Sequence, residues 1–205
     1  DAASSVRRVS DMTNPEHRLW AQFWVLACEA RGLEALTEQE LLQGLNKDVT
    51  SGQPAVQGLL TVTTTRGKRA STLQLRPDAV AHEQDGTTWL EVDRSKRGSD
   101  REASLAALVS SVGRVLKDGS VLRRVVILCK TERIRKRAVA VLNGLAEANN
   151  AEVLIAGRRH FRELEPGSYA VWSAQSSRLR DGRTKLVDTL AGHVIVQLLP
   201  IWLPK

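Results

Sequence analysis

The spacing of apolar residues predicts two helices near the start of the chain. Apolar residues recur at helical spacing between residues 15 and 30, and Asn14-Pro15-Glu16 supplies a cap, a first-turn proline and an acid where such a helix would begin. Residues 37–48 show a weaker helical pattern, and Thr37 followed by Glu40 is a capping-box sequence. The broad apolar face of the first helix predicts that it packs into the core.

The pattern then changes to strands. Apolar and β-branched residues over 59–65, 72–81 and 87–93 predict an antiparallel meander, with Pro77 interrupting its second strand. A helix capped by Ser99 or Asp100 is expected to follow and to end at Asp118-Gly119.

Two further strand segments are apolar without alternation, as in strands covered on both faces. They are Val125–Cys129 and residues 153–156, and between them a helix is expected from Thr131 through Ala148. Beyond Gly157 we expect a strand around residues 169–173, a short helix near 184–190 and an apolar ending, 194–203.

This order of elements predicts an α/β protein with a mixed sheet flanked by helices, because the helical crossovers join parallel neighbours. We expect residues 1–13 to form a tail or linker, 14–156 the core, and 157–205 a C-terminal extension packed on the core.

Charge is unevenly distributed along the chain of 205 residues. The net charge is +7, but residues 1–93 carry 9 Lys/Arg against 13 Asp/Glu, whereas residues 94–205 carry 21 against 10. A basic half of this kind favours a polyanionic partner. No uncharged apolar segment reaches the roughly 18 residues of a membrane span, and Cys28 and Cys129 lie in apolar runs without metal or redox spacing. These features predict a cytoplasmic protein with reduced thiols and no membrane contact.

Three acids stand out as candidate chemistry. Glu91 and Asp93 would project from the same face of one strand, and Asp78 lies on the strand expected to pair with it. Clustered carboxylates are how proteins hold hard cations, so Mg²⁺ or Mn²⁺ is the expected cofactor. The alternative is that Pro77-Asp78 makes a turn and the other two acids lie on a solvated strand face.

These segments also carry a resemblance to a known family. The helix, three-strand, helix, strand order, with Pro77-Asp78 and Glu91-Val92-Asp93, resembles the PD-(D/E)XK restriction-endonuclease-like superfamily. More narrowly, Leu75-Arg76-Pro77-Asp78-Ala79 followed by Trp89 to Arg94, together with His17-Arg18-Leu19, resembles the replication-relaxation proteins of plasmids and mobile elements, relatives of the mobilisation-C relaxases. The resemblance covers about residues 14–156 and implies an αβββαβ core.

The resemblance implies metal ligation by Asp78 and Glu91. It also places Asp93 where the superfamily has a lysine that stabilises developing negative charge, which an aspartate cannot do. Either Asp93 is a third ligand, or Lys96, Arg94 or Arg101 supplies the cation, or the site is inactive. His17 is a candidate base or ligand if the first helix borders the site; otherwise it is a first-turn residue that caps the helix or faces solvent.

The cations of the second half are candidate contacts to duplex DNA. Their alternative reading is a set of solvated faces. Because few aromatic residues accompany them, we expect backbone-directed binding rather than base stacking. The candidates are Arg94, Lys96, Arg97, Arg101, Arg133, Arg135, Lys136, Arg137, Arg158 and Arg159.

Three hypotheses follow. The first is a DNA-binding protein of a plasmid or mobile element, acting in relaxation, mobilisation or replication as a metal-dependent nickase or endonuclease alongside other mobilisation or replication proteins. The second keeps the fold and discards the chemistry, leaving a non-catalytic accessory or regulatory factor. The third is an interaction module whose apolar ending, 194–203, docks on a partner or on a second copy as a homodimer. That ending fits an ordinary core strand equally well.

Overall fold

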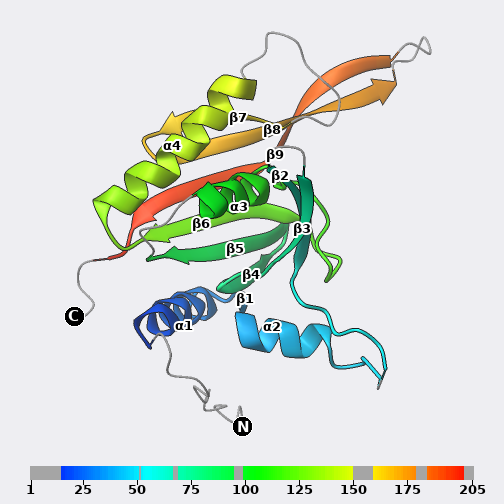
Figure 1. The fold of residues 1–205 in the computed structure, drawn as a ribbon, viewed down its shortest axis with the longest axis vertical. Coiled ribbons are helices and arrows are strands. Elements are labelled where there is room, and N and C mark those ends of the chain that lie inside the picture. Colours follow the sequence, from blue (N-terminus) through cyan, green and yellow to red (C-terminus); the bar gives the residue numbers. More distant parts are fainter. Residues whose placement is uncertain are drawn as a thin grey trace.

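A seven-stranded mixed sheet, with helices on both of its faces, forms the body of the protein (Figure 1). The computed structural model describes residues 15–50, 52–66, 69–94, 99–149, 159–178 and 184–200. The elements in chain order are α1 (Pro15–Glu29), β1 (Glu34–Thr37), α2 (Glu38–Leu45), β2 (Leu60–Arg66), β3 (Arg69–Leu75), β4 (Ala79–Glu83), β5 (Gly86–Asp93), α3 (Ser99–Val109), β6 (Leu122–Cys129), α4 (Glu132–Asn149), β7 (Arg159–Glu165), β8 (Ser168–Arg178) and β9 (Thr184–Leu198).

The strand order of the main sheet is β1-β4-β5-β6-β9-β8-β7. β1, β4 and β5 are antiparallel, β5, β6 and β9 run parallel, and β8 and β7 return antiparallel. The prediction of an α/β protein with a mixed sheet flanked by helices is therefore confirmed.

The predicted meander is wrong in its details. The expected strand over 72–81 divides at Pro77, which has no N–H to donate and a fixed φ, into β3 and β4. β3 pairs only with β2, in a separate two-stranded sheet, whereas β4 enters the main sheet. The strand that pairs with β4 at the edge of the main sheet is β1, which the sequence did not reveal because four residues are too short to show a period.

The helix predictions fare better. Thr37 caps α2, with its backbone N–H donating to Glu40 Oε2 at 2.9 Å and its side chain accepting from the Glu40 amide. α4 follows Thr131 as expected, and the Thr131 hydroxyl accepts from the Ile134 amide at 3.3 Å. α3, however, ends at Val109, nine residues before the predicted stop, because the chain turns through residues 110–113 to bring Gly113 against Leu122.

The short helix expected near 184–190 is also wrong. These residues begin β9, which pairs with β8 from Thr184 onward. Leu186 and Leu190 are spaced as on a helix, but they belong to a part of the strand that is largely exposed on both faces. β9 lies between β6 and β8 in the sheet, and Val194 and Val196 are buried, so the apolar ending is a core strand as far as Val196. Leu198, at the end of β9, is 40% exposed. The strand expected over 153–156 lies outside the described residues.

Two apolar clusters pack against opposite faces of the sheet. One joins α3, α4 and the β2–β3 hairpin to the sheet around Trp89, Leu142 and Tyr169. The other holds α1 against β1, β4 and β5 around Leu90 and Val92. Side chains therefore alternate along β5, so Trp89, Glu91 and Asp93 share the face of the sheet that carries α3. Within the described ranges, no helix is long and apolar enough to span a membrane.

Candidate functional site

Asp78 is fastened to the end of β5 that carries the other two acids. Its Oδ2 accepts a hydrogen bond from the Val92 amide at 2.6 Å, and its own amide donates to the Leu90 carbonyl at 3.0 Å. After burial, the charge of Asp78 is the next largest cause of the raised pKa of Glu91. Asp78, Glu91 and Asp93 thus gather where β4 begins and β5 ends, and we call them the acid cluster.

Glu91 is the most perturbed group of the acid cluster. Burial, and then the charge of Asp78, raises the pKa of Glu91 from 4.5 to about 8. Trp89 Nε1 donates to Glu91 Oε1 at 2.8 Å, which partly offsets the cost of burying a charge there. In the absence of another cation, Glu91 therefore carries a proton at neutral pH.

Arg101, in the first turn of α3, supplies positive charge to the acid cluster. Its Nε lies 3.2 Å from Asp93 Oδ1, and one terminal nitrogen lies 3.9 Å from Glu91 Oε2. The Asp93 side chain is 12% exposed and that of Arg101 42%. The guanidinium thus contacts two acids whose side chains are more shielded from solvent than its own.

His17, in the first turn of α1, borders the same site. Its Nε2 lies 3.1 Å from Asp78 Oδ1. The hydrogen bond to Asp78 raises the pKa of His17, against the opposing effects of burial and of the nearby arginines. With the Val92 amide on Oδ2, both oxygens of Asp78 have partners within the protein.

Beside the acid cluster, a second group of charges joins the start of α1 to the residues that follow β5 and β6. Glu16, at the start of α1, pairs with Arg94 and with Lys130, whose Nζ lies 2.9 Å from Glu16 Oε2. The Lys130 amide also donates to the Asp93 carbonyl at 2.9 Å. Arg94 and Lys130 hold the pKa of the Glu16 carboxyl below its usual value, although burial opposes them. The N-terminus of α1 is thereby anchored to the carboxyl ends of β5 and β6.

The donor set has the chemistry of a hard-cation site, because three carboxylates offer oxygen ligands. Its present arrangement is different: over the residues that the structure describes, no three His, Cys, Asp or Glu side chains are placed to hold a metal ion. His17 and Arg101 contact the oxygens that a cation would use. The residue types therefore fit Mg²⁺ or Mn²⁺, provided that these protein contacts are exchanged.

The other predicted DNA contacts fall into different environments. Arg133 and Lys136 are exposed at the start of α4, and Arg135 pairs there with Glu132 at 3.0 Å. Arg159 points into the protein, where its guanidinium donates to the Val112 carbonyl at 2.6 Å and to Ser173 at 2.8 Å. Arg137 is half-buried and engaged in a contact of its own. Lys96, Arg97 and Arg158 lie outside the described residues.

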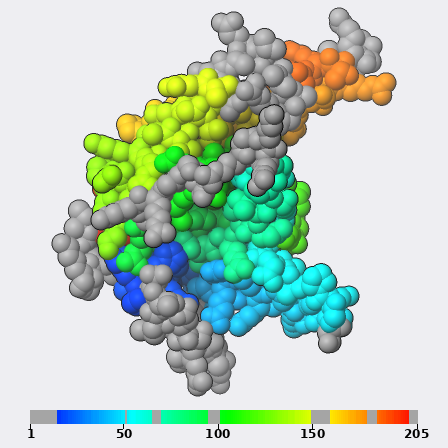
Figure 2. All heavy atoms as spheres, in the orientation of Figure 1, coloured from blue at the N-terminus to red at the C-terminus, as the bar shows by residue number. Residues whose placement is uncertain are grey.

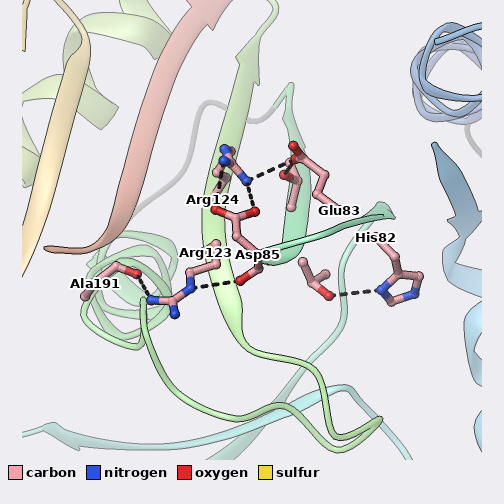
Figure 3. Close-up of polar contacts among 8 residues, drawn as sticks. His82, Glu83, Asp85, Arg123, Arg124 and Ala191 are labelled. Carbon is pink, nitrogen blue, oxygen red and sulfur yellow. Dashed lines mark hydrogen bonds and ion pairs between the residues drawn. The ribbon is translucent and has the colours of Figure 1, made fainter. Parts of the chain in front are cut away.

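A second cluster of acids and arginines lies at the opposite end of the β4–β5 hairpin (Figure 3). Arg124 binds both oxygens of Asp85 at 3.0 Å and approaches Glu83 at 3.2 Å. Arg123 links the Asp85 carbonyl at 3.0 Å to the Ala191 carbonyl at 2.9 Å. Because these contacts connect a turn to β6 and β9, we assign this cluster to stabilising the sheet.

Sequence reasoning missed the hydrogen bond from Trp89 to Glu91. The place of Trp89 two positions before Glu91 on one strand is the signal that the two side chains share a face. Arg101 was one of three candidate cations, and its approach to both acids depends on how α3 packs across β5, which sequence spacing does not encode.

Comparison with known proteins adds no relative. No family model, curated protein or solved structure matches the chain. The functional argument therefore depends on the residues and their geometry.

Proposed function

We propose that this chain is a DNA-binding protein of a plasmid or mobile element, with a restriction-endonuclease-like core, that acts in DNA relaxation, mobilisation or replication. When α2 and the β2–β3 hairpin are set aside as an insertion, the remaining order is α1-β1-β4-β5-α3-β6. This is the αβββαβ order that the resemblance implies. Asp78 precedes the second of its strands, and Glu91 and Asp93 lie on the third.

The observation that carries the proposal is the convergence of the acid cluster with His17 and Arg101 from four separate elements. Asp78, Glu91 and Asp93 would hold Mg²⁺ or Mn²⁺, which activates water and stabilises charge on a phosphate. His17 is placed to hold or transfer a proton at its Nε2, opposite Asp78. Arg101 and Lys130 provide positive charge for a phosphate, and Lys96 stays a candidate for the same role.

One observation favours the non-catalytic alternative. Asp93 stands where the superfamily has lysine, and each carboxyl group of the acid cluster already contacts His17 or Arg101. A protein that kept this arrangement on DNA would bind without cutting. It would then serve as an accessory or regulatory factor of the same fold.

A plasmid-nicking assay decides between the two. Supercoiled plasmid is incubated with the protein, with and without Mg²⁺ or Mn²⁺, and with Asp78→Asn and Glu91→Gln. The nuclease proposal expects metal-dependent conversion to the open-circular form, lost in both variants and kept in Glu132→Gln, whose carboxylate pairs with Arg135 outside the acid cluster. Nicking that needs no metal, or that survives Asp78→Asn, would contradict it.

Binding is measured separately by gel shift with duplex DNA at several salt concentrations. Arg133 and Lys136 are exposed at the start of α4, and each lost phosphate contact lowers the salt-dependence slope by about 0.9. We therefore expect the double substitution Arg133→Ala with Lys136→Ala to lower the slope by about 2. Binding without nicking would favour the accessory factor, and no binding at low salt would refute both versions.

A further inference from the structure

Arg101 lies where the acid cluster would need a cation. Its guanidinium reaches Asp93 at 3.2 Å and Glu91 at 3.9 Å, and its charge partly offsets the rise in the pKa of both Glu91 and His17. These distances are longer than the 3.0 Å contacts of Arg124 with Asp85 in the second cluster, so the geometry differs between the two arginines.

The position of Arg101 on α3 adds to this difference. Arg101 is the third residue of an eleven-residue helix, where the partial positive charge of the helix N-terminus disfavours a cation. Its side chain is 42% exposed, so an anion from solvent can reach it while Asp93 stays shielded. Asp93 and Glu91 therefore hold Arg101 in a place from which a stronger anion could withdraw it.

We propose that Arg101 is an exchangeable counter-ion that couples DNA binding to metal binding. In the DNA-free protein it contacts the carboxyl oxygens of Glu91 and Asp93 and thereby competes with a divalent cation for them. A phosphate of docked duplex DNA takes the guanidinium, and the competition from Arg101 for the oxygens of Glu91 and Asp93 is then removed. The inference rests on the proposed function, since it takes the anion to be a DNA phosphate.

Coupling of this kind is reciprocal. If DNA tightens the binding of the cation, the cation tightens the binding of DNA by the same factor. Removing Arg101 removes the competition, so the acid cluster should bind the cation well even without DNA, and the coupling should shrink. The device would keep the metal site closed until a phosphate is in place.

Isothermal titration calorimetry with Mn²⁺ tests the competition. Wild type, Arg101→Gln, Arg101→Lys and Arg162→Gln are compared without DNA. Arg162→Gln is the matched control, because it removes an arginine of β7, at the far edge of the sheet. There Arg162 contacts Asp188 of β9 at 3.0 Å. We expect Arg101→Gln to bind Mn²⁺ about tenfold or more tightly than wild type, because a unit charge a few ångströms away is removed, whereas Arg101→Lys and Arg162→Gln stay close to wild type.

The titrations are then repeated with a short duplex whose phosphorothioate linkages resist hydrolysis. Wild type and Arg162→Gln should gain Mn²⁺ affinity with the duplex, and Arg101→Gln should gain little. Equal Mn²⁺ affinity of wild type and Arg101→Gln without DNA, no Mn²⁺ binding by any variant, or full coupling in Arg101→Gln would overturn the proposal. If wild type fails to bind the duplex, the proposed function fails, while tighter Mn²⁺ binding by Arg101→Gln would still support competition at the acid cluster.

Discussion

Burial of Glu91 makes the stability of the protein depend on pH near neutrality. The pKa of Glu91 is 4.5 in the reference state and about 8 in the fold, so the native state keeps a proton that the unfolded chain releases between these values. Because the native state binds more protons in that window, the free energy of unfolding falls as pH rises through it. At about 1.4 kcal/mol for each pH unit, the loss amounts to as much as about 5 kcal/mol.

Glu91→Gln isolates this contribution. The amide stays neutral and can still accept from Trp89 Nε1, so the variant should lose less stability than wild type as pH rises from about 5 to about 8. His17 contributes in the same direction, because Asp78 raises its pKa and its stabilising charge is lost above that value; this slope stays in both proteins. Urea denaturation followed by tryptophan fluorescence, in EDTA, gives the free energy of unfolding at each pH.

The control is Glu132→Gln. Arg135 lowers the pKa of Glu132, so this acid titrates below the window and its removal should leave the slope of wild type unchanged. Parallel curves for wild type and Glu91→Gln across the window would refute the reasoning, because they would mean that folding does not raise the pKa of Glu91.

Two further pairs of substitutions test the packing of the fold. Leu142 is fully buried, whereas Leu26 is 53% exposed. In urea denaturation, Leu142→Ala should lower the free energy of unfolding by about 2–5 kcal/mol, and Leu26→Ala by no more than about 0.5 kcal/mol. Equal losses would contradict the assigned core. A Cβ on Gly192 would lie 1.9 Å from the Arg123 carbonyl oxygen. A Cβ on Gly119 would have no neighbour within 4 Å, and the cost there comes only from the positive φ of 86°. Thermal melts should therefore show a large loss of stability for Gly192→Ala and a cost of about 1–2 kcal/mol for Gly119→Ala; a mild effect at Gly192 would mean that β6 and β9 are not so closely paired.

The elements that the sequence predicted well are those with local signals. Thr37 and Glu40 form the expected capping box. The continuous apolar run Val125–Cys129 is a strand with parallel neighbours on both edges, and its side chains contribute to the apolar clusters on both faces of the sheet. β9 lacked such a signal. Leu186 and Leu190 are four residues apart, as on a helix, and only pairing with β8 makes them part of a strand.

The acid cluster was predictable for the same reason. Period-two alternation places Glu91 and Asp93 on one face, and the Pro77-Asp78 step marks the start of β4. Arg101 and His17 were named from the sequence as candidates, but their contacts and the donor from Trp89 were not predictable, because they depend on how α1, α3 and the sheet pack. Sequence reasoning therefore named the carboxylates and their candidate partners, and left open which of these partners contact them.

The two ends of the β4–β5 hairpin show what distinguishes a structural charge cluster from a candidate site. At the turn, Arg124 meets Asp85 with two 3.0 Å contacts, and the pKa of Asp85 is lowered, as expected where charges stabilise the fold (Figure 3). At the other end, burial and Asp78 raise the pKa of Glu91, and the arginine there lies farther from its acids.

The same hairpin carries both clusters, and one of them pairs its charges closely. The sheet therefore does not require the burial of Glu91 beside Asp78 that raises the pKa of Glu91. Figure 2 shows the surface on the side of α3 and α4, which belongs to the same face of the sheet as Glu91 and Asp93. Burying a carboxyl beside a second one, when apolar residues could fill the space at lower cost, is the pattern of a site retained for a ligand. That cost, more than the Pro-Asp and Glu-x-Asp sequences themselves, favours a binding role for this end of the hairpin.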